Sequence, residues 1–363
     1  MINLLIFFCS FIFLLTSIIG YGILFNNLCF KKLDDLYSEN SIFIGFYGLF
    51  FVTLISLFSS LFFQHNFIHN IILHCTGILL LIFLPVENKK KFLLYILLIA
   101  ILLFTALLIS KTHDDFSYYH LPFTKYLTEQ KIIFGMGHLN HGYNLLSSLF
   151  FLNSVFYLPF IEYYSFHFPL LFFLIFFNFF ILRETLKTSN KDFLKFLYIF
   201  AFVFFNLSFN RIAEYGTDKA GQLLIVVLII KLLEYICIDN EKKNITKLLF
   251  LIPLLALCIS LKTYFLPYIL LGALIIFIDN KKLNFFKKIF LSKSFFFFSG
   301  LLILNFSHHF ISTGCIISPL PFTCFGELTT WGKDLDVING LSIWLEQWAK
   351  AGAGPNFRVE NIN

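Results

Sequence analysis

The sequence predicts an all-α protein, a polytopic transmembrane helical bundle, because three features agree. Of its 363 residues, 58% are hydrophobic and 13% are charged, and the mean hydropathy is +0.82. A soluble domain carries roughly 25% charged residues. Apolar runs recur at about the 20 residues that a helix needs to cross a hydrocarbon core of roughly 30 Å. The Lys and Arg residues lie in short loops between these runs rather than on one face, which argues against a nucleic-acid partner.

A sliding window finds about ten such runs in order along the chain. The predicted spans are residues 2–25, 41–63, 68–86, 92–110, 159–182, 196–209, 220–238, 248–261, 264–278 and 295–311. No basic region precedes the first span and no small-residue cleavage site follows it. We therefore interpret it as a retained helix rather than a signal peptide.

The positive charges predict the orientation of the bundle. The loops after the first, third, fifth, seventh and ninth spans carry 17 of the 27 Lys and Arg residues. Basic residues are retained on the cytoplasmic side, so the N-terminus and the alternate segments are expected outside. Reading 248–278 as two short spans, rather than one interrupted helix, keeps the five lysines of loop 279–293 inside.

We expect one transmembrane domain, residues 1–311, and an extracytoplasmic tail, residues 312–363. The outward loop 111–158 contains an acidic motif and then "GYNLLSSLFFLNSVFYLPF", whose polar and apolar mixture predicts a helix along the membrane interface. The tail stops without a closing apolar element, which leaves open that the chain is truncated. Cys315 and Cys324 lie nine residues apart in the tail, where an oxidising exterior permits either a disulfide or two free thiols.

The stretch "HDDFSYYHLPF" is the first candidate for chemistry. It gathers His113, Asp114, Asp115 and His120 directly after a predicted span. Carboxylates at this place touch water and the bilayer edge together, as the base of a membrane enzyme must. The alternative is that the two aspartates only cap and solvate the start of a short helix.

The same loop leaves a divalent cation site open, although no cofactor is certain. His138 and His141 follow further along, and the spacing "HLNH" can place two imidazoles on one face of a turn. No zinc motif such as HExxH is present in the sequence. Ordinary loop histidines are the alternative interpretation.

A second outward turn, "FNRIAEYGTDKAGQ", carries charges of both signs. They are Arg211, Glu214, Asp218 and Lys219. These groups can form solvated ion pairs that contribute little to the stability of the fold. Alternatively, the planar guanidinium of Arg211 can fork onto a phosphate. Inside the next span, Lys231 and Glu234 are three residues apart and are expected to pair for structural reasons.

Lys262 lies in the turn "SLKTY" between the two short spans of 248–278. Helices of about 14 or 15 residues reach only about 21 Å, so this turn is expected below the outer surface. A lysine there needs a wet cavity or an anion. The alternative is that Lys262 snorkels to the lipid headgroups.

Together these features resemble the GT-C superfamily of integral membrane glycosyltransferases. More narrowly, "HDDFSYYHLPF", "EYGTDKAGQLL", "LKTYFLP" and "WAKAGAGPNFRVEN" look like stretches that mark a group of bacterial membrane proteins found in surface-polysaccharide settings. One departure concerns the acid-bearing loop. It follows the first span in well-studied GT-C enzymes, whereas here it follows the fourth predicted span.

The resemblance implies that a sugar moves from a polyprenyl-phosphate donor to an acceptor outside the bacterial inner membrane. Asp114 or Asp115 would take the proton of the acceptor hydroxyl, while Lys262 and Arg211 would stabilise the leaving lipid phosphate. The substrate-binding residues implied are His113, Tyr118, Tyr119, His120, Arg211, Glu214, Asp218 and Lys262. The tyrosines would stack on sugar faces, or else anchor the chain at the interface. The implied partners are the lipid-linked sugar and membrane lipid, without nucleic acid.

Two other functional classes stay open at this point. A transporter or flippase of lipid-linked sugars also uses an intramembrane lysine and external acids, although broken helices in paired halves are expected there. A non-catalytic partner in polysaccharide assembly would use the outward loops to bind another enzyme.

Overall fold

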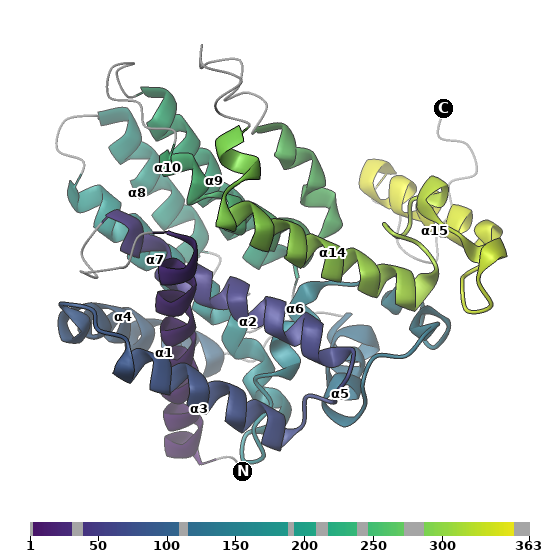
Figure 1. Ribbon diagram of the computed structural model, residues 1–363, viewed down its shortest axis with the longest axis horizontal. Coiled ribbons are helices and arrows are strands. Elements are labelled where there is room, and N and C mark those ends of the chain that lie inside the picture. The colour runs from purple at the N-terminus through teal and green to yellow at the C-terminus, as the bar shows by residue number, and fades with distance from the viewer. Residues whose placement is uncertain are drawn as a thin grey trace. The chain divides into compact units, whose positions relative to one another are not determined.

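The computed structural model describes residues 3–30, 39–108, 115–187, 192–207, 217–237, 246–271 and 287–351. Within these ranges the chain is predominantly helical and forms no β-strand, as Figure 1 shows. The chain forms two compact units. Unit 1 comprises residues 1–131 and 147–302, and unit 2 comprises residues 132–146 and 303–363. The expected boundary at residue 311, between a transmembrane domain and an extracytoplasmic tail, stays a prediction.

Unit 1 contains most of the helices. Their bounds are α1 Leu4–Cys29, η1 Glu39–Phe43, α2 Ile44–Ser60, α3 Phe67–Phe83, α4 Lys89–Phe104, η2 Thr105–Leu108, η3 Phe116–His120, α5 Leu121–Glu129, α6 Ser148–Ser154, η6 Glu162–His167, α7 Phe168–Lys187, α8 Asp192–Leu207, α9 Asp218–Cys237, α10 Thr246–Leu249, α11 Ile252–Leu261 and η9 Thr263–Ile269. Helix α14, Lys293–Thr313, begins in unit 1 and ends in unit 2. Unit 2 also holds η4 Met136–His138, η5 His141–Asn144, η10 Pro321–Thr323, η11 Gly326–Leu328 and α15 Leu335–Ala351.

Six described helical segments are long and apolar enough to cross a membrane. They are Leu4–Cys29, Ser41–Ser60, Lys89–Leu108, Glu162–Lys187, Asp218–Cys237 and Lys293–Thr313. Three shorter apolar helices, Phe67–Phe83, Phe193–Leu207 and Ile252–Leu261, coincide with further predicted spans. The predicted span 264–278 is described only in part, as the 3₁₀ helix η9 with Pro267 inside it, and its remainder lies outside the described residues.

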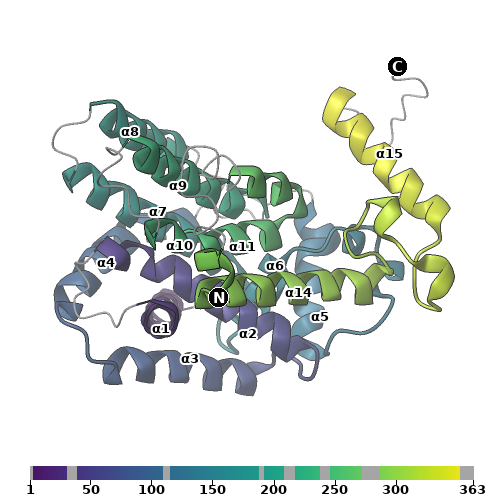
Figure 2. The ribbon, with the colours of Figure 1, turned by 45° about the horizontal axis from the view of Figure 1, so that its top comes forward.

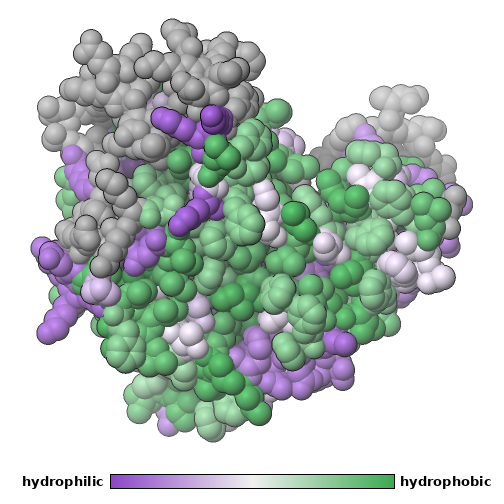
Figure 3. Space-filling view, in the orientation of Figure 1, coloured by the Kyte–Doolittle hydropathy of each residue, from purple (hydrophilic) through white to green (hydrophobic). Residues whose placement is uncertain are grey.

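Helix α7 lies at the centre of unit 1. Every residue from Phe168 to Ile181 is buried, as expected for a helix that is apolar on all sides. Helices α2, α4, α8 and α9 pack around it, and Figure 2 shows α7, α8 and α9 side by side. The outer surface over α1 and α3 is mainly hydrophobic in Figure 3. Such a surface is suited to lipid rather than to water.

Helix α6 occupies the segment in which we expected a helix along the interface. All seven of its residues are buried, so its polar groups meet protein rather than lipid headgroups. Asn70 of α3 donates its side-chain amide to the carbonyls of Ser154 and Tyr157, at 2.9 and 3.0 Å. His74 Nε2 lies 3.0 Å from the Val155 carbonyl. These contacts satisfy the last carbonyls of α6 and fix its C-terminal end to α3.

Helix α5 is the described helix that directly follows the acidic motif. It is amphipathic, with Phe123 and Leu127 buried, while Lys125 and Glu129 are exposed and lie 3.8 Å apart. One face therefore packs on protein and the other remains free. This is the pattern that we had expected of the later segment.

Candidate functional site

The acidic motif is described from Asp115 onward and continues as η3, a single π-helical turn. The Leu121 N–H donates to the Phe116 carbonyl, five residues back, instead of four. Pro122 explains the wide turn, because proline has no N–H to donate and its ring crowds the carbonyl four residues before it. The wide turn sets the direction of the side chains that follow Asp115.

Tyr119 is a hydrogen-bond partner of the acid. Its hydroxyl donates to Asp115 Oδ2 at 3.4 Å, and both side chains are half-buried. Burial raises the pKa of the Tyr119 hydroxyl, and the carboxylates of Asp115 and Asp218 raise it further. The hydroxyl therefore stays protonated and remains a donor. The effect of Asp218 also shows that the first residue of α9 lies within electrostatic reach of this turn.

Lys262 and Asp218 form an ion pair. Asp218 starts α9, whereas Lys262 follows the last residue of α11. The Lys262 Nζ also lies over the ring of Tyr264, 5.7 Å from its centroid. The carboxylate and the ring both attract the ammonium group. The lysine side chain is 34% exposed and that of Asp218 is 53% exposed, so the pair is open to exchange with other ions.

A glycine on α9 allows the Lys262 turn to sit against that helix. Gly221 lies one turn after Asp218, and a Cβ added to it would overlap the ring of Phe265 in η9. Phe265 is buried at this contact. The sequence "TDKAG" therefore places an acid and a docking surface for η9 on neighbouring turns of one helix.

Helix α6 holds the two parts of the site together. At its N-terminal end, Ser147 Oγ donates to the Leu261 carbonyl at 2.6 Å, and Ser148 Oγ lies 2.9 Å from Ser260 Oγ. These contacts fix the end of α11 directly before Lys262. Phe150 of α6 follows Ser147 by three residues. Its ring centroid lies 5.2 Å from that of His120 and 6.1 Å from that of Tyr119. The lysine turn and the acid turn are thus attached to one rigid turn of helix.

The other sequence-predicted residues divide into two groups. Tyr118 is exposed and contacts Tyr119 edge to face, whereas His120 is buried against Tyr119 and Phe150. Tyr118 is therefore accessible to a ligand, and His120 contributes to packing. Four predicted residues lie outside the described residues: His113, Asp114, Arg211 and Glu214.

The two histidines considered for a metal belong to unit 2. His138 Nε2 lies 3.1 Å from the Trp331 carbonyl, and the His141 ring packs edge to face on Trp344 at 5.9 Å. Burial, together with the charge of Lys333, lowers the pKa of His141. Among the residues that the structure describes, no three His, Cys, Asp or Glu side chains gather as metal ligands. The spacing "HLNH" brings both imidazoles to neighbouring aromatic residues and carbonyls instead.

A second ion-pair cluster lies near the other end of α9. Lys231 donates to Glu234 at 2.7 Å, which confirms the predicted pair, and it also pairs with Glu184 of α7. Lys187 adds a contact to Glu184 at 3.8 Å. The sequence did not reveal Glu184, since it is 47 residues away from Lys231.

Three residues that assemble the region around Lys262 and Asp218, which we call the open site, were not identified from the sequence. Ser147, Gly221 and Tyr264 act through contacts between segments distant in the sequence. The available signal was weak. Two adjacent serines in an apolar run, and a glycine at the start of a predicted span, indicate close helix packing in a membrane.

The described residues define an integral membrane protein of the all-helical class, with six helices able to span a bilayer. Residues 4–351 match the family described as "Domain of unknown function (DUF8201)", and the chain belongs to that family. Among curated proteins and among solved structures, nothing matches the chain.

Proposed function

We propose that this protein is a membrane glycosyltransferase of the GT-C type, which moves a sugar from a polyprenyl-phosphate donor to an acceptor outside the cytoplasm. One observation carries the proposal. The Asp115 turn and the Lys262 turn are both attached to α6. Tyr119 hydrogen-bonds to Asp115, Asp218 pairs with Lys262, and the charge of Asp218 acts on Tyr119. A proton acceptor and an anion-binding cation thus occur in one partly open region of unit 1.

The chemistry of sugar transfer requires both groups. The acceptor oxygen attacks the anomeric carbon of the sugar, and a new glycosidic bond forms. The bond between that carbon and the phosphate oxygen breaks, so the lipid phosphate leaves with the electron pair. In this proposal the acceptor proton passes to the Asp115 carboxylate and Lys262 stabilises the leaving phosphate.

Tyr119 has a positioning role in this scheme. Its hydroxyl remains protonated, because its pKa is raised, and it donates to one oxygen of Asp115. The other carboxylate oxygen then has a preferred direction toward the acceptor. The exposed ring of Tyr118 provides a face on which a sugar can stack.

Asp218 has a different role, as the partner of Lys262 before the donor arrives. The phosphodiester of the donor carries one negative charge, as a carboxylate does, and its charge increases as the bond to the sugar breaks. In this proposal the donor phosphate exchanges with Asp218 at the ammonium group, and Lys262 then binds the leaving phosphate more strongly than it binds Asp218. An ion pair that is half exposed makes this exchange feasible, since water can solvate the released carboxylate.

The site is proposed to face outward from a bacterial inner membrane. The positive-inside rule puts the Asp115 turn on that side. The disulfide between Cys315 and Cys324 supports an oxidising environment for the segment after α14, which the same rule also places outside.

A transfer assay on the full chain in lipid nanodiscs tests the proposal. Radiolabelled polyprenyl-phosphate sugar is supplied with membranes from a deletion strain as the source of acceptor. We expect label in the acceptor fraction with the natural protein and with Lys125→Met, an exposed-lysine control. Asp115→Asn should abolish transfer with donor binding retained, whereas Lys262→Met should weaken donor binding.

Unchanged transfer in Asp115→Asn would contradict the assignment of the base. Movement of the intact lipid-linked sugar across the bilayer of proteoliposomes, without label in any acceptor, would instead indicate a flippase.

A further inference from the structure

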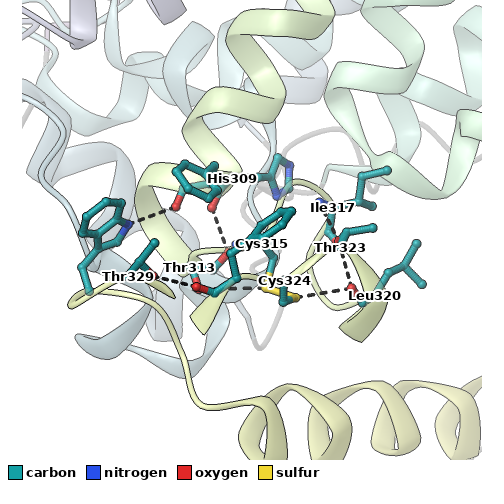
Figure 4. The surroundings of a disulfide bond; sticks show 11 residues. His309, Thr313, Cys315, Ile317, Leu320, Thr323, Cys324 and Thr329 are labelled. Carbon is teal, nitrogen blue, oxygen red and sulfur yellow. Dashed lines mark hydrogen bonds between the residues drawn. A yellow bond between two sulfur atoms is a disulfide. The ribbon is translucent and has the colours of Figure 1, made fainter. Parts of the chain in front are cut away.

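The segment after α14 is a closed hairpin, residues 314–325. Cys315 and Cys324 form a disulfide and an isolated antiparallel bridge (Figure 4). The Phe325 N–H donates to the Gly314 carbonyl at 2.8 Å, and the Ile316 N–H donates to the Thr323 carbonyl at 3.0 Å. Residues 314–325 are therefore held in one defined shape, and we call them the disulfide hairpin.

The chain after the hairpin returns to the end of α14. The Lys333 N–H donates to the carbonyl of Thr313, the last residue of the helix, at 3.0 Å. Trp331 packs on this end too, with its indole N–H 3.3 Å from the Phe310 carbonyl and its ring 5.9 Å from that of Phe310. Tryptophan with one apolar and one hydrogen-bonding side is typical of the level at which a span leaves the bilayer. Because α14 is a candidate span, the hairpin begins at that level.

The tip of the hairpin is apolar and uncharged. Residues 313–326 contain no Asp, Glu, Lys or Arg. Phe322 is 85% exposed, and Leu328, directly after the hairpin, is 82% exposed. Leu320 points away from the disulfide in Figure 4. A rigid loop in water does not usually present a phenylalanine in this way, since the apolar surface gains nothing from being fixed there.

Comparable exposure occurs on a shorter apolar helix and on a candidate span. Phe83 at the end of α3 and Leu102 in α4 are each 75% exposed, on surfaces that lipid covers in a membrane protein. Phe322 lies nine residues after the end of α14, so the same lipid is within reach. A soluble protein partner usually has polar residues around the rim of its docking surface. Residues 313–326 contain no charged residue, and Glu327, directly before Leu328, is the first acid after the hairpin.

We propose that the disulfide hairpin is a membrane-interface anchor, in which Phe322 and Leu328 insert among the phospholipids that surround the end of α14. The hairpin would lie at the headgroup and acyl-chain boundary, about 5–10 Å into the leaflet, as amphipathic interfacial elements do. The anchor fixes unit 2 to the bilayer surface independently of any substrate.

Photo-crosslinking to lipid tests this inference. Benzoyl-phenylalanine replaces Phe322 or Leu328, one at a time, in the full chain in nanodiscs that contain phospholipid with tritiated acyl chains. Both positions are highly exposed, so the larger side chain is not expected to disturb folding. The control position is Asp336, an exposed acid in the first turn of α15, which should remain in water.

We expect tritium on the protein after irradiation at positions 322 and 328 and only background at 336. A crosslink from position 322 to another polypeptide, with no tritium, would show that a protein covers the hairpin and would overturn the proposal. Equal tritium at all three positions, or none at any of them, would also contradict it.

Discussion

Lys231 and Lys262 each meet a carboxylate of α9 and an aromatic ring, yet one is enclosed and the other is open. Lys231 lies 5.6 Å from the Phe180 centroid, and its side chain is 15% exposed. Its partner Glu184 is 8% exposed. For Lys262 and Asp218 the corresponding values are 34% and 53%. Unit 1 therefore contains two lysine–carboxylate ion pairs that differ in their access to solvent.

The difference separates a structural role from a candidate binding role. Two carboxylates surround Lys231, and Lys187 contributes a further positive charge, so the charges balance inside the protein. An external anion would have to displace Glu184, which is buried, as well as Glu234, which is 34% exposed. Lys262 has one carboxylate partner that water can reach, so a ligand phosphate can replace it at little cost.

The largest expected effect is the loss of the enclosed lysine. Lys231→Met leaves Glu184 buried without its main counter-charge, which should lower the free energy of unfolding by about 3–5 kcal/mol. Thermal unfolding in a mild detergent measures this change. Lys262→Met should lower it by no more than about 1 kcal/mol, since exposed pairs contribute little. Similar decreases in the free energy of unfolding for both variants would contradict the distinction between an enclosed and an open lysine.

The next effect concerns the contact between Gly221 and Phe265, which holds η9 and the Lys262 turn against α9. Gly221→Ala forces a methyl group into the Phe265 ring, and overpacking of this kind destabilises proteins by about 1–3 kcal/mol. We also expect weaker binding of polyprenyl phosphate, because η9 and Lys262 must shift. Gly300→Ala is the matched control, since a Cβ at that helical position meets nothing within 4 Å. Equal behaviour of the two variants would show that the Phe265 contact is unimportant.

A smaller effect is expected at α6. Ser147→Ala removes the donor to the buried Leu261 carbonyl, which should destabilise the protein by about 1 kcal/mol and weaken phosphate binding. Ser165→Ala serves as the control, because that buried hydroxyl donates to Glu162 within its own helix. Phosphate binding that is unchanged by Ser147→Ala would show that α6 does not position the Lys262 turn.

The smallest effect has the opposite sign. Asp218→Asn removes the carboxylate that competes for Lys262, so the affinity for polyprenyl phosphate should rise by about two- to fivefold, the equivalent of one exposed ion pair. Titration of the lipid phosphate into nanodiscs, with Asp336→Asn as control, provides the measurement. A clear loss of affinity in Asp218→Asn would mean that the aspartate orients the lysine rather than competing for it.

The sequence predicted the parts of the fold that depend on local composition. The apolar runs that form α1, α7 and α9 were predictable because each has about as many residues as a helix needs to cross a bilayer. The pair of Lys231 and Glu234 was visible because residues three apart share one face of a helix.

The parts that depend on tertiary contacts were not predictable in the same way. A short polar and apolar segment is compatible with an interface or with the interior, and α6 is buried because α3 and α11 supply partners for its ends. The Asp218 partner of Lys262 is 44 residues away, so no spacing rule could reveal it. The predictions for His113, Asp114, Arg211 and Glu214 fall outside the described residues.

Lysine footprinting tests the central claim most directly. The full chain in nanodiscs is treated with an amine-reactive acetylating reagent, with and without polyprenyl phosphate, and each lysine is quantified by mass spectrometry. We predict that Lys262 reacts and that the lipid phosphate protects it, while Lys125 reacts equally in both samples and Lys231 in neither. Labelling of Lys262 that the lipid phosphate leaves unchanged would contradict the proposal that this lysine binds the donor.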